Sequence, residues 1–369
     1  MSANSRNLVA ACAAISVFGL AFGMSYPLLS LILESRGVSS AMIGINASMG
    51  TLGIVVFSPF IPALANRFGS RRVALIAAAL TALTMPAFLL FPSLEAWIVL
   101  RFIQGSASSV LWVLSEAWIV KFAADDKRGR VVAVYSSILS ASFGAGPLIV
   151  GMIGIEGWTP FLIGTAALIL GMIPLSLVRD ENTTLPEEAA PSGLLDFAPR
   201  APMLLACVGV FAIFDAATLS LIPVYGIYNG LDLTVSAYLL SALILGNVIM
   251  QFPIGWLADR LPKRMVLIGC AVVASVFLAL LPLIINTWLK WPVVIMLGAS
   301  GYGVYTVALA SLGDRFHGSE LVNGAASFAT MWGLGAFFGS ISSGWALAGS
   351  STWGLPGYLM ICYLLLAFG

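Results

Sequence analysis

The chain has 369 residues, of which 60% are hydrophobic and 9% are charged, and its formal net charge is +1 at pH 7. A soluble domain could not bury so much apolar surface, so this composition excludes a water-soluble protein and indicates membrane-spanning helices. Without a soluble domain, nucleic-acid binding is not expected.

Other function classes are excluded by missing motifs. The chain has no G-x-x-x-x-G-K-[ST] loop, so we do not expect ATP hydrolysis, and its single histidine argues against a metalloprotease. Its four cysteines lie inside apolar runs without metal-ligand spacing and are interpreted as small buried hydrophobes. We therefore predict no enzymatic activity, no cofactor and no metal.

The apolar residues fall into segments of the length that crosses a bilayer, which is about 20 residues. The sequence predicts twelve such helices: 8–33, 40–64, 72–92, 97–121, 130–154, 157–178, 202–228, 234–257, 264–286, 291–313, 321–346 and 353–369. The predicted fold class is an all-α polytopic membrane protein. The last segment is barely long enough to span a bilayer, so truncation of the chain at its C-terminus is kept as an alternative.

The basic residues are distributed unevenly along these predicted segments. If the N-terminus is inside, most of the 17 Lys and Arg residues lie at inner ends, Arg36 and Lys290 lie outside, and Arg101 lies within a helix. This bias predicts a cytoplasmic N-terminus in a bacterial inner (plasma) membrane. Residues 179–201 form a Pro- and Glu-rich inner linker without a stable fold of its own. The linker separates residues 1–178 from residues 202–369.

Two short basic loops repeat at an offset of 193 residues, one within 62–72 and the other within 255–267. The same offset holds over most of the chain, without gaps. It pairs Val17-Phe18 with Val210-Phe211, Gly53 with Gly246, Gly105 with Gly298, Gly146 with Gly339, and Gly151 with Gly344. A single register of this length indicates an internal duplication. We expect Gly255 to end one helix and Pro262 to prevent its continuation.

At these loops the chain resembles the major facilitator superfamily, which carries a G-x-x-x-D-R-x-G-R-[RK] loop after its second helix and often after its eighth. The matching gating-loop residues are Asn66, Arg67 and Arg71 in the first copy and Asp259, Arg260 and Arg264 in the second. The first copy departs from the pattern at Pro62 and Asn66. The Ser-Glu-x-Trp string at 115–118 is similar to the YcaD-like subgroup.

The resemblance implies two pseudo-symmetric six-helix bundles with a solute path between them, and transport by alternating access. The basic loops would then stabilise the outward-facing state by bridging the halves. A small-molecule solute, protons and the lipid bilayer are the expected partners, and we expect a monomer.

Ionisable side chains inside a membrane are costly, about 2.5–3.5 kcal/mol each at a helix centre, and are candidates for function. Asp215 lies mid-helix, and the equivalent position in the first half of the repeat is Phe22. Asp215 is predicted to exchange a proton. The alternative is that it serves as a structural partner for a hydroxyl or a carbonyl. Arg101 and Gln104 resemble the family's R-x-x-Q-G motif, which the family associates with proton coupling. Arg101 could tune an acid, bind an anionic group or snorkel outward. Glu116 lies about 22 Å further inward along the helix and is favoured as a gate over a proton site.

Small residues mark a second motif on the fifth predicted helix. Gly146, Pro147 and Gly151 resemble part of the antiporter motif G-x-x-x-G-P-x-x-G-G, and Gly339 and Gly344 echo it in the second half. Plain helix packing explains this motif at least as well as a directional signal.

Polar and aromatic residues that could line a cavity are scattered over several helices: Tyr26, Trp112, Asn247, Gln251, Tyr302, Tyr305 and Trp332. For any one of them, packing against lipid or another helix is the simpler explanation. An aromatic-lined cavity with few charges suits a hydrophobic or weakly polar solute. The leading hypothesis is proton-coupled export of such a molecule. The alternatives are proton-coupled uptake of a nutrient or metabolite and, against the evidence of duplication, a membrane-embedded enzyme or receptor.

Overall fold

The computed structural model describes residues 3–122, 128–178, 194–317 and 319–369, and all regular structure in them is helical. Most of the predicted linker, residues 179–193, lies outside this description, as does Lys127. The helices are α1 (Ala3–Ser35), α2 (Ser40–Phe57), η1 (Ser58–Phe60), α3 (Ile61–Phe68), α4 (Ser70–Leu90), α5 (Leu94–Phe122), α6 (Arg128–Ile153), α7 (Thr159–Leu177), α8 (Leu194–Phe197), α9 (Pro202–Tyr228), α10 (Leu233–Arg260), α11 (Lys263–Ile284), α12 (Lys290–Arg315), α13 (Ser319–Gly349) and α14 (Gly354–Phe368).

The all-α membrane architecture predicted from the sequence is confirmed. Within the described residues, ten helical segments are long and apolar enough to cross a membrane. One of these segments, Ser40–Phe68, combines α2, η1 and α3. α13, with 31 residues, and the shorter α14, with 15, occupy the last two predicted spans.

The second predicted helix, 40–64, is interrupted in the structure. A 3₁₀ turn, η1, separates α2 from α3, and prolines stand at the start of both η1 and α3. Pro59 and Pro62 cannot donate the helical hydrogen bond, and their rings crowd the preceding turn, so the helix axis is broken there. Gly69, at φ +86°, then ends α3. Residues 62–68 of the first basic loop therefore lie on a separate short helix, and Arg71 and Arg72 lie in the first turn of α4.

The expectation that Gly255 ends a helix is wrong. α10 continues through Gly255 to Arg260, and the chain reverses only at Leu261 and Pro262, directly before α11. A Cβ atom added at Gly255 would meet nothing within 4 Å, so neither a turn nor a close contact requires glycine there. Pro262 has the predicted effect, because α11 begins immediately after it.

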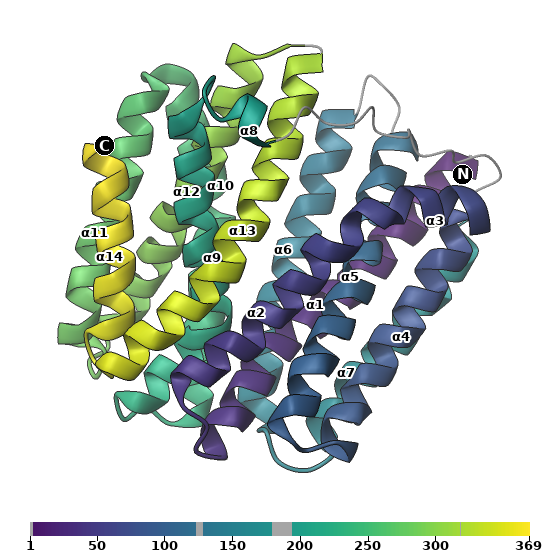
Figure 1. Ribbon diagram of the computed structural model, residues 1–369, viewed down its shortest axis with the longest axis horizontal. Helices are drawn as coiled ribbons and strands as arrows, with labels where there is room; N and C mark the ends of the chain where they lie inside the picture. The colour runs from purple at the N-terminus through teal and green to yellow at the C-terminus, as the bar shows by residue number, and fades with distance from the viewer. Residues whose placement is uncertain (1–2, 123–127, 179–193, 318) are drawn as a thin grey trace. The chain divides into compact units, whose positions relative to one another are not determined.

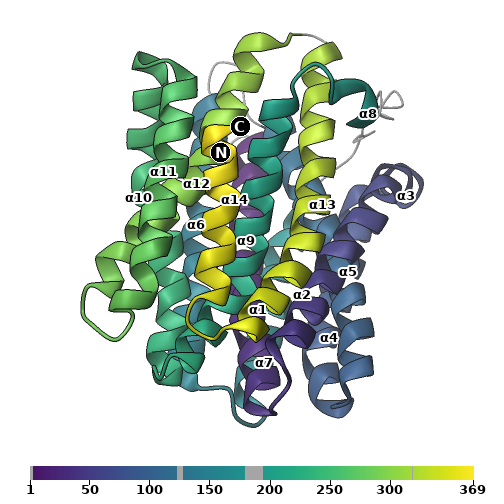
Figure 2. The same cartoon turned by 60° about the vertical axis from the view of Figure 1, so that its left-hand side comes forward.

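Packing divides the chain into two compact units, residues 1–28 with 49–188 and residues 29–48 with 189–369. Residues 29–48, which include the start of α2, belong to the second unit, whereas the duplication places them in the first half. In the second unit, Ser40 Oγ donates a hydrogen bond to the Gly344 carbonyl at 3.1 Å, and Gly44 lies against Gly344 on α13. Also within this unit, α9 packs beside α12, α13 and α14 (Figures 1 and 2).

The duplication appears in the contacts inside each unit. Gly105 on α5 lies against the backbone of Gly50 on α2, and Gly298 on α12 lies against the backbone of Leu243 on α10. These four positions are related in pairs by the offset of 193 residues found in the sequence. Two further pairs of contacts are related by the same offset. The contact of Gly53 with Ser106 corresponds to that of Gly246 with Ala299. The contact of Gly19 with Ser142 corresponds to that of Ala212 with Gly335. Equivalent helix pairs therefore approach at equivalent residues.

The described end of the predicted linker packs on the second unit. α8 carries Phe197, which is buried with its ring centroid 5.1 Å from that of Phe316. Arg200 forms an ion pair with Glu320 at 3.2 Å. Residues 194–200 therefore have a defined place against α13 and the end of α12.

Candidate functional site

The carboxylate of Asp215 is hydrogen-bonded to a side chain of another helix in the second unit. Asp215 lies on α9, and the hydroxyl of Tyr302 on α12 donates a hydrogen bond to its Oδ1 at 2.9 Å. Trp332 on α13 also lies near this carboxylate. Asp215, Tyr302 and Trp332 are all half-buried. Three predicted site residues therefore meet at one point.

Several aromatic rings pack together next to this carboxylate. Phe211, one helical turn before Asp215, stacks on Tyr305 with centroids 4.5 Å apart and meets Tyr302 edge-on at 5.7 Å. Phe214 meets Tyr302 edge-on at 5.6 Å. The rings keep Tyr302 in place through offset and edge contacts. Tyr305 is thus joined to the site through Phe211.

Small residues allow the three helices to bring these side chains together. Gly301 lies against the ring of Phe214, so that a Cβ atom there would stand 2.5 Å from the ring. Ala212, Ala216 and Ala336 form a buried cluster between α9 and α13, and Trp332 packs against it. The alanines bring α9 and α13 close while leaving the Trp332 indole within reach of Asp215.

The arrangement has a definite chemical capacity. The carboxylate accepts a hydrogen bond from a neutral donor, and no cation of the described residues forms an ion pair with it. Such a group can hold a negative charge, accept a proton, or face a positively charged group of a ligand.

A second cluster lies in the first unit and contains three further predicted residues. Arg101 on α5 is buried, with 3% of its surface exposed, and its Nη1 donates to Gln104 Oε1 at 3.3 Å. The Tyr26 ring on α1 lies under the guanidinium, with its centroid 5.1 Å from Cζ. Phe143 on α6 packs against Tyr26 at 6.0 Å. Arg101 is therefore held inside the bundle, so snorkelling of its charge to the outer surface does not describe it.

The residues equivalent to Asp215 and Tyr305 in the first half are Phe22 and Trp112. Their rings stack with centroids 6.0 Å apart. This first-half pair is aromatic at both positions, whereas the second half has an acid and a tyrosine there.

The remaining predicted cavity and coupling residues lie apart from these clusters. Glu116 is exposed on α5, next to Ser115, whose hydroxyl is 3.0 Å from that of Tyr135. On α10, Asn247 is half-buried and Gln251 is exposed. The structure does not bring Glu116, Asn247 or Gln251 into the contacts described for Asp215 or Arg101.

The predicted gating residues lie at helix ends. Asn66, Arg67 and Arg71 are exposed, and the Arg67 guanidinium lies over the neighbouring Phe68 ring at 5.2 Å. In the second copy, Arg260 lies over Trp256 at 4.0 Å.

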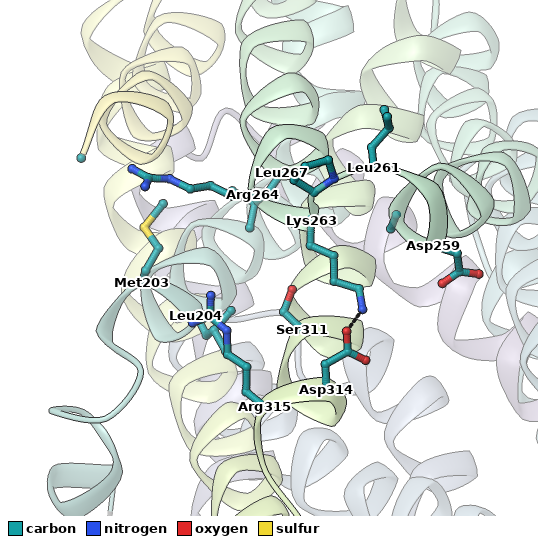
Figure 3. A pocket seen from close by; sticks show the side chains of 13 residues that line it. Met203, Leu204, Asp259, Leu261, Lys263, Arg264, Leu267, Ser311, Asp314 and Arg315 are labelled. Atoms are coloured by element: carbon teal, nitrogen blue, oxygen red, sulfur yellow. Dashed lines mark hydrogen bonds and ion pairs between the residues drawn. The ribbon is translucent and has the colours of Figure 1, made fainter.

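Asp259 and Arg264 line a pocket of about 850 Å³ at the ends of α9, α10, α11 and α12 (Figure 3). In this pocket Lys263 pairs with Asp314. The Asp259 side chain points away from that ion pair.

The helix-packing motif makes close backbone contacts. Gly146 on α6 lies against the backbone of Gly23 and Met24 on α1, and Gly339 on α13 lies against Ile213 on α9. Pro147 and Gly151 lie within α6, and Gly344 packs on Ser40. These contacts give the glycines a packing role, and a directional role stays a prediction.

Two residues of the Asp215 site were not predicted from the sequence, Phe211 and Phe214. Both lie on α9 among many other apolar residues, so their identity alone carries little information. The available signal was the spacing of Phe211, because a residue four positions before an intramembrane acid is its neighbour on the helix surface.

Comparison with known proteins decides the family. The family model described as Major Facilitator Superfamily matches residues 11–340, with a second match at 229–369. The chain belongs to the major facilitator superfamily. The fold class predicted from the basic loops and the duplication is thereby confirmed.

The superfamily relatives found by sequence are themselves described as transporters. The uncharacterized MFS-type transporter YfkF of Bacillus subtilis is 23% identical over 90% of this chain and 86% of its own length. The uncharacterized MFS-type transporter YcaD of Escherichia fergusonii is 23% identical over 87% of this chain and 84% of its own. This agrees with the predicted similarity to the YcaD-like subgroup.

Solved structures show the same superfamily fold. The nucleoside transporter NupG, in a mutant form, superimposes with a TM-score of 0.79 at 14% identity, covering 100% of this chain and 98% of the other. A second NupG structure gives a TM-score of 0.76 at 13% identity over the same shares. These structures show the fold of the chain, and its membership of the superfamily makes it a multi-pass membrane protein and a secondary transporter.

Proposed function

We propose that this chain is a proton-coupled exporter of small hydrophobic or weakly polar molecules, working by alternating access, with Asp215 as the group that takes up and releases the proton. The observation that carries the proposal is the hydrogen bond from Tyr302 to Asp215 inside a bundle of apolar helices. We further propose that the protein lies in a bacterial inner membrane with its N-terminus in the cytoplasm, in agreement with the distribution of Lys and Arg.

The environment of Asp215 fits a proton-exchanging role, and the hydrogen bond from the Tyr302 hydroxyl also fits the structural alternative, so the pH dependence of transport decides between them. In mid-helix Asp215 accepts from a neutral side chain, and no cation of the described residues forms an ion pair with it. The charged and protonated forms can both be accommodated, since either form retains oxygens that accept hydrogen bonds. A proton that enters the membrane field carries about 2.3 kcal/mol per 100 mV, enough to bias a conformational equilibrium.

The neighbouring rings support a largely apolar solute. Phe211, Tyr305 and Trp332 supply aromatic surface next to a single acid. A site of this composition favours apolar bodies with few polar groups. The direction of transport rests on the partial antiporter motif at Gly146 and Pro147, so it needs its own measurement.

The test uses the full chain in proteoliposomes with an imposed proton gradient. The solute is first found by screening compounds for stabilisation of the purified protein and for counterflow. We expect efflux-direction flux to follow the proton gradient and to lose that dependence in Asp215→Asn, which keeps the shape but cannot titrate. Asp232→Asn is the matched control, because Asp232 caps α10 by accepting from the Val235 amide and asparagine caps equally well.

Two results would contradict the proposal. If Asp215→Asn transports at the wild-type rate with the same pH profile, Asp215 does not couple protons. If an inward proton gradient drives uptake of the solute, the chain is a symporter and not an exporter.

A further inference from the structure

The buried pair Arg101 and Gln104 presents hydrogen-bond donors that the protein itself does not satisfy. Both side chains project from α5, three residues apart, and are 3% and 4% exposed. Residues at this spacing share one face of a helix. The pair therefore forms a small polar site inside the first unit.

A count of donors and acceptors defines the site. A guanidinium has five N–H donors and no acceptor, and a side-chain amide has two donors and one acceptor oxygen. That single oxygen, Gln104 Oε1, already accepts from Arg101 Nη1. Arg101 Nε and Gln104 Nε2 are both buried without an acceptor among the described residues. What remains is a surface made only of donors.

The charge of the site is also uncompensated. No carboxylate of the described residues lies within ion-pair distance of Arg101, and its one close aromatic partner is the face of Tyr26. A cation–π contact offsets only a part of the desolvation of a buried guanidinium. A bound anion would supply both the missing charge and the missing acceptors.

We propose that Arg101 and Gln104 bind the carboxylate of the transported solute, so that the solute class is monocarboxylates with an apolar or aromatic body. Two carboxylate oxygens match in number the two unsatisfied nitrogen atoms, Arg101 Nε and Gln104 Nε2, and one negative charge matches one guanidinium. A phosphate dianion would leave a net charge in apolar surroundings. The ring pair Tyr26 and Phe143 lies beside the donors and offers apolar surface to the rest of the solute.

The ring of Tyr26 controls access to this site. Tyr26 is half-buried, whereas Arg101, whose guanidinium lies against the face of this ring, is buried, so the ring shields one side of the guanidinium. A ligand reaches the donors when this ring moves aside. The proposal rests on the proposed function in one respect, namely that the ligand is taken to be the transported solute.

The experiment measures binding directly and does not depend on transport. The full chain, reconstituted in lipid nanodiscs, is titrated with sodium phenylacetate and sodium octanoate, and with their neutral amides at matched ionic strength. The readouts are tryptophan fluorescence and the thermal unfolding midpoint. We expect saturable binding and stabilisation by at least one acid, and binding of its amide weaker by about tenfold or more, because an amide lacks the charge that Arg101 requires.

Three variants locate the effect. Arg101→Lys keeps the charge but loses the planar fork, and should weaken carboxylate binding on the order of tenfold. Gln104→Leu removes the amide, with both its N–H donors and the oxygen that accepts from Arg101, and should weaken carboxylate binding several-fold. This variant gives a second reading if Arg101→Lys folds poorly. Arg36→Lys is the control, since Arg36 is an exposed arginine outside the site, and it should bind as the wild type does.

The outcomes separate this proposal from the proposed function. Equal binding of acid and amide, binding unchanged by both Arg101→Lys and Gln104→Leu, or no binding of either acid would overturn the subsite. Proton-driven transport by the wild type would survive each of these results. Conversely, carboxylate binding that persists while Asp215→Asn transports with an unchanged pH profile would leave the subsite standing and refute the coupling role.

Discussion

Tyr302 donates its hydroxyl hydrogen bond to Asp215, from a different helix, over 2.9 Å. In the duplicated first half the same two positions are Ser109 and Phe22. The carboxyl group is therefore present at this position in the second half and absent from the equivalent position of the first. The proposed proton exchange is thus assigned to one half alone.

The hydroxyl of Tyr302 can be removed without removing its ring. In Tyr302→Phe the charged form of Asp215 loses a hydrogen bond worth about 1.5–3 kcal/mol, so protonation becomes easier. The pH dependence of transport should then move toward higher pH by roughly one unit or more, and solute binding should change little. The measurement is transport rate against pH in proteoliposomes, and an unchanged profile would disprove the coupling between these two residues. Tyr358→Phe, which removes a hydroxyl bonded to Ser342, serves as the control.

Two equivalent glycines should be intolerant of a methyl group. In Gly105→Ala and Gly298→Ala the new Cβ would collide with backbone atoms of Gly50 and Leu243, which cannot turn aside as a side chain would. We expect each change to destabilise the fold by about 1–3 kcal/mol or more, seen as a lower thermal unfolding midpoint.

Gly255→Ala is the matched test of that interpretation. Gly255 also lies in a helix, but a Cβ there meets nothing within 4 Å. Alanine should be neutral or stabilising by about 0.5–1 kcal/mol. Equal losses in all three variants would show that the close contacts are not the cause.

The indole of Trp97 closes the connection between α4 and α5. Its Nε1 donates to the Phe88 carbonyl at 2.8 Å, and the residue is fully buried. Trp97→Phe should cost about 1–3 kcal/mol, because a buried carbonyl loses a donor. Trp288→Phe, at a position that is 75% exposed, should leave the unfolding midpoint unchanged.

Asp259 provides a test of the predicted gating loop. It is exposed at the end of α10 and lines the pocket that contains the Lys263–Asp314 pair. We expect Asp259→Ala to slow turnover several-fold while solute affinity stays similar, measured by counterflow and by equilibrium binding. Loss of binding with normal turnover per bound solute would argue against a gating role.

The sequence was sufficient to predict the architecture for a physical reason. Close backbone contacts require glycine, so Gly105 and Gly298 keep the same register in both halves and report the duplication directly. Intramembrane charge is costly, so Asp215 and Arg101 were also visible as isolated residues.

Other features depended on three-dimensional packing. Phe211 and Phe214 resemble every other apolar residue of α9, and only the structure shows that they touch Tyr302. Gly255 was misread because a glycine near a loop suggests a helix end, whereas α10 extends to Arg260. Asn247 and Gln251 share a helix face, but pattern alone could not show whether that face meets Asp215.

The backbone-to-backbone contacts at Gly105 and Gly298 also bear on how the molecule can move. Two helices whose main chains touch cannot slide or roll past each other without separating. We therefore expect two helix pairs to move as rigid units during turnover: α2 with α5, which touch at Gly50, and α10 with α12, which touch at Leu243. The conformational changes of the transport cycle would then occur at other positions, such as a hinge at the proline-containing turn η1 between α2 and α3.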